Sequence, residues 1–464
     1  MKELLEQARD RAVTRGVQFM DARYSASDQT GVRVQDNRAD ELNQMSGSAV
    51  GIRVLVDDAW GFASSDVLTA DALSASLDAA IAMARGSAER VLDPGVVALV
   101  QPVVDTVRVA VERDPRDIEL AEKVRLATAY ETAGRAAGGD AISNSFVGIV
   151  DSWSREIICN TVGTLIEQEK LRTLLFAMYT ASDGTTRQRS FEARAAQRGF
   201  ELVDETSAED LSVKAARTAV SLLTAKRCPS GRFTVVLDPS GAGVFAHEVL
   251  GHNAEADYVF AGTSIIEGKV GERIGSEHVT IVNDATIPRA NGSYIYDSEG
   301  VPGARIPIIE RGVLTGYLHS LESAARLGAV PNGCGRAQDG HSLPQVRMSN
   351  TFFAGGEKSF DELIADIDTG MLIEDAGGGY VYPERGTYTV TAGKGRMIRN
   401  GELAEPIREI TFTGVLLETL QNVEGATKDI ELLPNTCGKG GQVVHVTTGG
   451  PYVRIRDVVV GGQE

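Results

Sequence analysis

The 464-residue sequence lacks a long hydrophobic segment. No stretch approaches the roughly 18 consecutive apolar residues that a membrane-spanning helix needs. The first residues, MKELLEQARDRAVTRG, mix charged and apolar side chains in an amphipathic pattern, whereas a signal peptide has an uninterrupted apolar core. We therefore expect a cytoplasmic protein with no membrane segment.

The sequence also has no excess of basic residues. Lysine and arginine total 46 against 64 aspartate and glutamate residues, which gives a formal net charge of −18. Without a basic run to offset it, this charge disfavours general affinity for nucleic acid or anionic membranes. The length suggests two or three domains.

Cysteines are few and widely spaced. Cys159, Cys228, Cys334 and Cys437 form no C-x-x-C pair, so we expect no disulfide framework in a reducing compartment. Isolated cysteines are usually small buried hydrophobic residues, and only Cys437 has surroundings that suggest another role.

The pattern of residues changes near position 227. Before it, helical patterns alternate with period-two patterns typical of strands. The predicted helices are 2–15, 69–86 (with Thr69 as N-cap), 116–136 and 207–226, and the predicted strands are 31–36, 48–58, 146–152, 164–170 and 174–181. These elements predict an N-terminal α/β domain over residues 1–227, although they also fit an α+β arrangement.

After residue 227 the chain is rich in glycine and in short alternating segments. The predicted strands are 234–238, 278–284, 304–320, 386–402, 408–419 and 443–448, and the few predicted helices are the HEVLGH segment, 320–328 and 359–368. We predict a largely antiparallel β domain with inserted helices over residues 228–464. The fold class predicted for the whole chain is α+β.

A glycine pattern, Gly241-x-Gly243-x-x-Ala246, follows a predicted strand and begins a predicted helix. This spacing matches the dinucleotide fingerprint, in which backbone amides approach a pyrophosphate. The fingerprint also requires a second strand ending in an acidic residue about 20 positions later. Residues 253–275 supply no such strand, so we do not favour a dinucleotide site.

The segment FAHEVLGHNAEAD, residues 245–257, resembles the H-E-x-x-H helix of zinc peptidases with one extra residue. In a regular α-helix, residues five apart point about 140° away from each other. His247 and His252 can share a metal only if the helix widens into a π-bulge or ends between them, and Gly251 permits either change. The sequence Asp238-Pro239-Ser240 provides a cap and entry for this helix.

Two histidines do not complete a catalytic zinc site, which usually has three protein ligands and one position for water. Cys437 lies in PNTCGKGGQ, which we interpret as a loop, and metal and Lys439 would stabilise its thiolate. Glu248 is then placed as the general base for a metal-activated water.

Spacing alone leaves other candidates open. Cys334, in NGCGR, is a rival third ligand, and His341 could be a ligand or an oxyanion donor. The two histidines could also be ordinary members of an apolar helix, and Glu248 could be a solvated or ion-paired side chain.

Several motifs in order resemble the TldD branch of the TldD/PmbA (TldD/TldE) peptidases. Besides H-E-x-x-x-H and the acidic pair Glu255 and Asp257, they are GIRVLVDDAWGFASSD (51–66), GKVGERIGSEHVTIVND (268–284), YDSEGVPGARIPIIERGVLTGYLHS (296–320), RMSNTFF (347–353) and TCGKGGQ (436–442). The resemblance covers essentially the whole chain. Cys334 has no required counterpart in the family pattern, so its role stays open.

The resemblance implies a zinc-dependent peptidase with His247, His252 and Cys437 as metal ligands and Glu248 as catalytic base. It also implies action on flexible or unfolded peptides, as in leader removal, peptide maturation or degradation. The implied partner is a PmbA/TldE-type paralogue in a heterodimer, with a homodimer as the alternative. We expect substrates to add to an exposed strand edge. Two other functions stay open: a non-catalytic peptide-binding subunit, and a zinc hydrolase acting on a non-peptide substrate.

Overall fold

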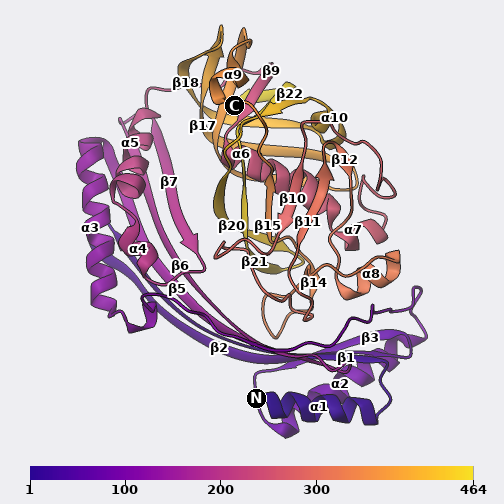
Figure 1. Cartoon of the computed structure of the whole chain (residues 1–464). Helices are drawn as coiled ribbons and strands as arrows, with labels where there is room; N and C mark the ends of the chain where they lie inside the picture. Colours follow the sequence, from indigo (N-terminus) through magenta and orange to yellow (C-terminus); the bar gives the residue numbers. More distant parts are fainter. Residues whose placement is uncertain (463–464) are drawn as a thin grey trace.

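A computed structural model describes residues 1–462 of the chain. A long, strongly curved N-terminal sheet wraps around a β-rich C-terminal unit, which lies against its concave face (Figure 1). Helices cover the other, convex face of the curved sheet. The predicted α+β class is confirmed.

The curved sheet has the strand order β3-β2-β1-β5-β6-β4, with β7 also paired to β6. All of its pairings are antiparallel except β4–β6. Its strands are β1 (Phe19–Gln35), β2 (Arg38–Val56), β3 (Ala59–Ser65), β4 (Val104–Val107), β5 (Ile142–Asn160), β6 (Leu165–Ser182) and β7 (Arg187–Ala196). Side chains alternate along each strand: on β6, Leu171, Leu175 and Tyr179 are buried beneath the helices, whereas Lys170 and Arg172 face the concave side half-buried.

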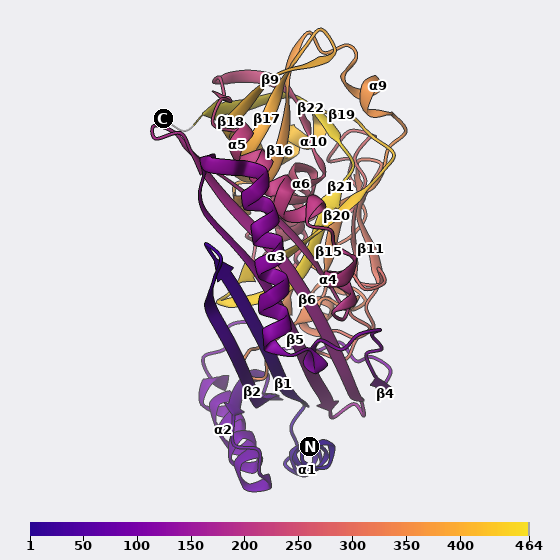
Figure 2. The ribbon, with the colours of Figure 1, turned by 90° about the vertical axis from the view of Figure 1, so that its left-hand side faces the viewer.

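Two apolar clusters attach the helices to the convex face (Figure 2). One cluster joins α1 and α2 to one end of the sheet, and the other joins α3, α4 and α5 to the opposite end. The helices are α1 (Lys2–Thr14), α2 (Ala70–Ala88), α3 (Leu120–Gly138), α4 (Glu201–Glu205) and α5 (Lys214–Ser221), with short turns η1 (Pro115–Asp117), η2 (Gly139–Ala141) and η3 (Glu209–Val213). The Thr69 hydroxyl accepts a hydrogen bond from Ala72 N, which confirms the predicted cap of α2.

The C-terminal unit is built on two larger sheets. One has the order β12-β11-β10-β15-β21-β20; the other has the order β19-β22-β9-β16-β17-β18-β8, and an additional β18–β22 pairing closes part of it. A small β13–β14 ribbon is separate. The strands are β8 (Lys226–Arg227), β9 (Gly231–Leu237), β10 (Ile281–Asp284), β11 (Arg305–Glu310), β12 (Val313–Leu314), β13 (Gly335–Arg336), β14 (Gln345–Val346), β15 (Asn350–Phe353), β16 (Thr369–Tyr382), β17 (Thr387–Arg399), β18 (Glu402–Val415), β19 (Val423–Ala426), β20 (Glu431–Lys439), β21 (Gln442–Gly450) and β22 (Val453–Gly462).

One helical segment lies between these two sheets and contacts strands of both. It begins at Pro239, where Asp238 accepts a hydrogen bond from Gly241 N at 2.8 Å, so the predicted cap is confirmed. A Cβ atom on Gly243 would lie 2.3 Å from Gly449 N, so this glycine allows the helix to approach β21 closely. The helices and turns of the unit are α6 (Pro239–Val244), η4 (Phe245–Gly251), η5 (His252–Ala254), α7 (Ala256–Phe260), α8 (Leu321–Leu327), α9 (Phe360–Ile364) and α10 (Leu416–Gln421).

Several predicted boundaries were wrong. The predicted strands 164–170 and 174–181 are one continuous strand, β6, because both sections pair with β5. The predicted strand 304–320 is limited to β11 and β12, and residues 416–419 of the predicted strand 408–419 begin α10. The strands β16 and β20 were not predicted, since glycines and a proline interrupt the alternation of their sequences. The strand β22 was also not predicted, although its first residues, VRIR, alternate.

The curved sheet and the C-terminal unit are joined by a buried ionic contact. Arg53 on β2 binds Asp21 on β1 at 2.5 Å and Glu299 of the C-terminal unit at 2.8 Å. The boundary predicted near residue 227 stays a prediction; β8, which includes that residue, pairs with β18. Within residues 1–462, the helices are all too short or too polar to cross a membrane.

Candidate metal centre

The helix between the two sheets widens where the sequence predicted a disruption. Residues Phe245–Gly251 form a π-helical turn, and a backbone hydrogen bond of the π type joins His252 N to His247 O. Because π-helical bonds connect residues five apart, this geometry brings the two histidines to one side of the helix. Their ring centroids lie 5.2 Å apart.

Gly251 permits the widened helix because it lacks a side chain, and not through the backbone freedom of glycine that we expected. Its backbone is ordinary right-handed helix, with φ −56°, so the left-handed freedom of glycine is not used. A Cβ atom at this position would instead lie 2.0 Å from Met348 Sδ. The missing side chain lets the π-turn pack against the buried Met348.

Cys437 reaches the histidines from a strand, which corrects the expectation that it lies in a loop. β20 pairs with β21, and Cys437 lies opposite Val444. Gly440 and Gly441, both with positive φ, form the tight turn between these strands. The glycines of this motif therefore end a hairpin, and the cysteine lies two residues before the end of β20.

The ligand atoms of His247, His252 and Cys437 all lie within 4.8 Å of one another. All three residues are buried. The Sγ atom of Cys437 is 3.7 Å from His252 Nε2, close to the roughly 3.5 Å expected between sulfur and nitrogen ligands of one tetrahedral zinc ion. His247 Nδ1 is buried and has no hydrogen-bond partner in the described chain. The donor set therefore fits a borderline-soft metal ion such as zinc.

The three residues alter one another's protonation. Burial alone would raise the pKa of Cys437, but the adjacent His247 and His252 outweigh this effect and lower it to about 4. Burial likewise disfavours charge on His252, but Glu255 and Cys437 raise its pKa. The cluster thus favours a thiolate, the form in which cysteine binds metals.

A second layer of charged residues orients His252. Glu255 Oε2 is 2.9 Å from His252 Nδ1, which leaves Nε2 directed toward Cys437. Lys439 Nζ donates to Glu255 Oε2 at 3.0 Å and to Asp257 at 2.7 Å. Burial disfavours a charged Glu255, but Lys439 and His252 outweigh this effect and lower its pKa to about 2.

Lys439 was expected to stabilise the Cys437 thiolate, but in the structure it pairs with Glu255 and Asp257. Its ammonium binds two carboxylates and the Val346 carbonyl, while the thiolate of Cys437 is stabilised by the histidines. The structural roles of Glu255 and Asp257 were missed; the signal was a pair of acidic residues three and five positions after His252. Carboxylate–histidine contacts of this kind commonly orient metal ligands.

Glu248 lies at the open side of the cluster. Its side chain is 26% exposed, and Oε2 is 3.7 Å from His252 Nε2. A Cβ atom on Gly379 of β16 would lie 3.4 Å from Glu248 Cγ, so β16 passes directly beside this carboxylate. Glu248 is accessible to a substrate in a way that the three buried residues are not.

The structure does not bring Cys334 or His341 into the cluster. The Cys334 thiol is fully buried near Asn283 Nδ2, at 3.9 Å, and burial raises its pKa. His341 is exposed, with Nδ1 3.0 Å from the Ser64 hydroxyl on the curved sheet. Neither residue is placed to complete the group formed by His247, His252 and Cys437.

The dinucleotide interpretation also finds no support. Residues 253–275 form short helices and turns and contain no strand. Gly243 packs against β21, so the glycine spacing serves helix–sheet packing.

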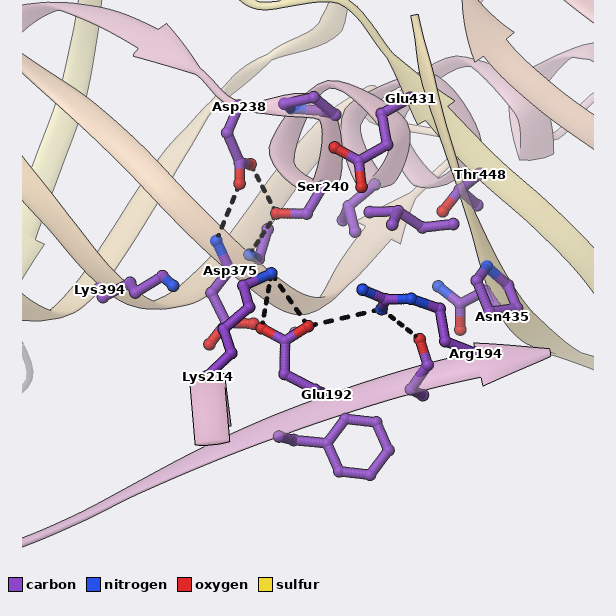
Figure 3. Close-up of a pocket in the computed structure, with 18 residues that line it drawn as sticks. Glu192, Arg194, Lys214, Asp238, Ser240, Asp375, Lys394, Glu431, Asn435 and Thr448 are labelled. Atoms are coloured by element: carbon purple, nitrogen blue, oxygen red, sulfur yellow. Dashed lines mark hydrogen bonds and ion pairs between the residues drawn. The ribbon is translucent and has the colours of Figure 1, made fainter. Parts of the chain in front are cut away.

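Two strand edges lie unpaired next to the cluster. β16 pairs with β9 only over Gly370–Ile373, so within residues 1–462 its later part is paired with β17 alone. β20 is the last strand of its sheet. Both edges border a charged cavity of about 280 Å³ (Figure 3).

This cavity lies between the curved sheet and the C-terminal unit. On one wall, Glu192 of β7 binds Lys214 at 3.0 Å and Arg194 at 3.6 Å. On the other, Asp238 accepts hydrogen bonds from Ser240 and from Asp375 N. Val244, three residues before His247, also lines the cavity, which therefore reaches within one helical turn of the cluster.

Two histidines, one cysteine and an adjacent carboxylate constitute a candidate centre of the metallohydrolase class. Comparison with known proteins agrees with this class. Residues 20–84, 113–223 and 230–462 match domain 1, the central domain and the C-terminal domain of the PmbA/TldA metallopeptidases, respectively. The chain belongs to the PmbA/TldD metallopeptidase family, as the sequence motifs predicted.

Known relatives share nearly the whole chain. A metalloprotease of Methanothermobacter thermautotrophicus is 39% identical over 454 residues, 96% of each chain. A zinc metalloprotease TldD homolog of Saccharolobus solfataricus is 25% identical over 96% of this chain and 97% of its own. The crystal structure of TldE from Thermococcus kodakarensis shares the fold, with a TM-score of 0.79 and 19% identity over 99% of this chain and 100% of that chain.

Proposed function

We propose that this chain is a zinc-dependent peptidase of the cytoplasm that hydrolyses peptide bonds in unfolded or flexible polypeptides. The observation that carries the proposal is the convergence of three ligand atoms within 4.8 Å, with the Glu248 carboxylate beside them. The name of the Saccharolobus relative, a zinc metalloprotease, supports zinc as the metal.

His247, His252 and Cys437 would hold the ion, and Glu248 would serve as the general base. When bound, zinc would supply Lewis acidity toward a water molecule and a carbonyl oxygen. Glu248 then takes a proton from the attacking water and passes it to the departing amine. Glu255 holds His252 with Nε2, the atom that would bind the ion, directed toward Cys437.

We propose that the substrate binds as an extra strand along the free edge of β16. This edge runs past Glu248. Asp375 N and Ala376 N are bonded to Asp238 and Ser240, but within residues 1–462 the part of β16 after Ala376 has no strand partner on this side. Backbone groups of a free edge bind an extended peptide with little regard to its sequence. A peptide methylated at its backbone nitrogens cannot donate these hydrogen bonds. We therefore expect such a peptide to compete with an unmethylated substrate at least tenfold more weakly, measured as an inhibition constant. Equal competition by the two peptides would argue against strand addition.

We also propose that the chain works as a dimer with a PmbA/TldE-type paralogue, or with a second copy of itself. The family resemblance is the basis for this proposal, and the fold shared with the Thermococcus TldE structure is compatible with it.

The decisive experiment combines metal analysis with a cleavage assay on an unstructured peptide. We expect about one zinc per chain, and loss of cleavage by at least a hundredfold in Glu248→Gln with zinc retained. Cys437→Ser should lose most of its zinc, and the Co²⁺-substituted wild type should show a cobalt–thiolate absorption band that this variant lacks. Glu277→Gln, an exposed carboxylate elsewhere, and Cys334→Ser are the matched controls.

Each alternative gives a different result. Peptide binding without any turnover, alone or with the paralogue, would indicate a non-catalytic subunit. Turnover of a non-peptide ester or amide with no peptide cleavage would indicate another kind of hydrolase. Normal cleavage by Glu248→Gln would refute the assigned base.

A further inference from the structure

Three basic residues gather where β6 of the curved sheet faces the C-terminal unit. We call Lys170, Arg172 and Arg336 the basic cluster. Lys170 and Arg172 are on the concave face of β6, and Arg336 is on β13 of the C-terminal unit. Lys170 Nζ and the Arg336 guanidinium lie on the same aromatic ring, that of Tyr294, at 6.0 and 5.0 Å from its centroid.

The positive charge of the basic cluster is poorly compensated. Lys170 has one carboxylate nearby, Glu156 at 3.7 Å. Within residues 1–462, Arg172 and Arg336 have no carboxylate within 4 Å, and their side chains donate hydrogen bonds to backbone carbonyls. Burial, followed by the nearby charge of Arg336, lowers the pKa of Arg172 to about 9. The basic cluster is therefore a local concentration of positive charge in a protein whose net charge is −18.

Uncommitted hydrogen-bond donors lie beside these cations. Ser152 and Ser154 of β5 pair with Arg172 and Lys170, respectively, so the hydroxyls share the concave face with the two cations. Neither hydroxyl makes a hydrogen bond to another residue of 1–462, and both residues are half-buried. Cations and hydroxyls together are the groups that bind a carboxylate.

The basic cluster lies close to the candidate metal centre. Arg336 Nη2 donates to His445 O at 2.8 Å. His445 pairs with Thr436, which directly precedes Cys437. Successive residues of a strand point to opposite faces, so Thr436 and His445 face away from Cys437, toward the basic cluster. Because β20 is the last strand of its sheet, a peptide can pass around its edge from the metal centre to the basic cluster, and at about 3.3 Å per residue this path needs only a few residues.

We infer that the basic cluster, with the hydroxyls of Ser152 and Ser154, forms a subsite for a carboxylate of the peptide substrate. The carboxylate can be the C-terminus of the peptide or an acidic side chain. The identity of the ligand, a peptide carboxylate, rests on the proposed peptidase function. The position of the subsite rests on the charges and hydrogen-bond donors described above.

Equilibrium binding tests this inference without requiring turnover. In full-length Glu248→Gln, we would measure the affinity of a fluorescent, unstructured peptide in three forms: free C-terminal acid, C-terminal amide, and amide with one internal glutamate. We expect at least tenfold tighter binding of a carboxylate-bearing form than of the neutral amide. The form that shows this preference identifies the source of the carboxylate.

Substitution locates the subsite. In the Glu248→Gln background, Arg172→Gln should abolish the carboxylate preference and leave the affinity for the neutral amide unchanged. Lys170→Gln should weaken the carboxylate preference. Arg155→Gln is the matched control, because Arg155 lies next to Ser154 but points to the opposite face, paired with Glu167 at 2.7 Å. Equal affinity for all three peptides, or a preference that survives both Arg172→Gln and Lys170→Gln, would overturn the inference.

A second measurement separates this inference from the peptidase proposal. Sodium acetate, compared with sodium chloride at equal ionic strength, should raise the melting temperature of the wild type more than that of Arg172→Gln. This result would support a carboxylate site even if no peptide were cleaved. Identical acetate effects on the two proteins, together with no peptide preference, would show that the basic cluster binds no carboxylate.

Discussion

At the scale of single residues, the site depends on one absent side chain. The extra residue in HEVLGH is accommodated by a π-turn, and this turn packs against Met348 only because Gly251 has no Cβ. Ordinary zinc-peptidase spacing needs no such adjustment, since residues four apart already share a helix face. Glu248, directly after His247, lies at the exposed side of this turn.

We predict that Gly251→Ala destabilises the protein by about 1–3 kcal/mol, because its new methyl group overlaps buried Met348. The zinc content should fall together with the stability, since the candidate ligand His252 is the next residue after Gly251. Thermal unfolding and metal analysis measure both effects. In the double variant Gly251→Ala/Met348→Ala, the loss of stability should be smaller than the sum of the two single losses.

Gly86→Ala is the matched control for this prediction. Gly86 is also helical, but a Cβ there meets nothing within 4 Å. We expect this change to stabilise α2 slightly, by up to about 1 kcal/mol. Similar destabilisation at both glycines would show that helix propensity, and not contact with Met348, controls the effect.

At the scale of elements, long strands carry charged contacts between distant parts of the curved sheet. Glu167 on β6 is buried and binds Lys2 of α1 at 2.8 Å, Arg108 at 2.8 Å and Arg155 of β5 at 2.7 Å. Burial opposes ionisation, but these three cations outweigh it and lower the pKa of Glu167 to about 2. The ionised carboxylate therefore ties the first helix to the sheet.

We predict that this carboxylate contributes ~2 kcal/mol of stability at neutral pH. Because its pKa is lower in the folded than in the unfolded chain, the contribution is complete above pH ~4.5 and is lost as the pH falls toward 2. Glu167→Gln should thus be less stable than the wild type at pH 7, with the difference shrinking on acidification. Urea unfolding across this range measures the difference, and a pH-independent difference would contradict the prediction.

At the scale of the whole molecule, the candidate centre is enclosed. His247, His252 and Cys437 are at most 9% exposed, the helix that carries the histidines lies between two sheets, and the curved sheet covers one side of the C-terminal unit (Figure 1). Under the proposed function, an extended chain would approach Glu248 along β16, and we expect this enclosure to exclude folded domains.

We predict that an unfolded protein is cleaved and the same protein in its native state is not. A disulfide-containing domain gives both forms from one sequence: the native form, and a form that is reduced and alkylated. The paralogue is included in both reactions if cleavage requires it. Mass spectrometry of the products measures the difference, which should exceed a hundredfold in rate. Comparable cleavage of the native domain would indicate a far more open site.

Much of the local structure followed from sequence alone. The caps at Thr69 and Asp238, the main strand-rich regions and the disruption of the HEVLGH helix depend on neighbouring residues, so short-range patterns predict them. The α+β class and the family also followed from the sequence. Strand lengths and boundaries did not, because pairing with distant strands decides where a strand ends.

What only the tertiary structure decided was which distant residues meet. Spacing favoured Cys437 but could not exclude Cys334 as the third ligand. Strand pairing brings Cys437 to 3.7 Å from His252, 185 residues earlier in the chain, and leaves Cys334 outside the cluster. Lys439 faces two carboxylates, and the basic cluster combines residues of two distant strands, contacts that no local pattern encodes. The sequence determined the chemistry available and the local turns, because these arise between neighbours; packing and strand register determined the site.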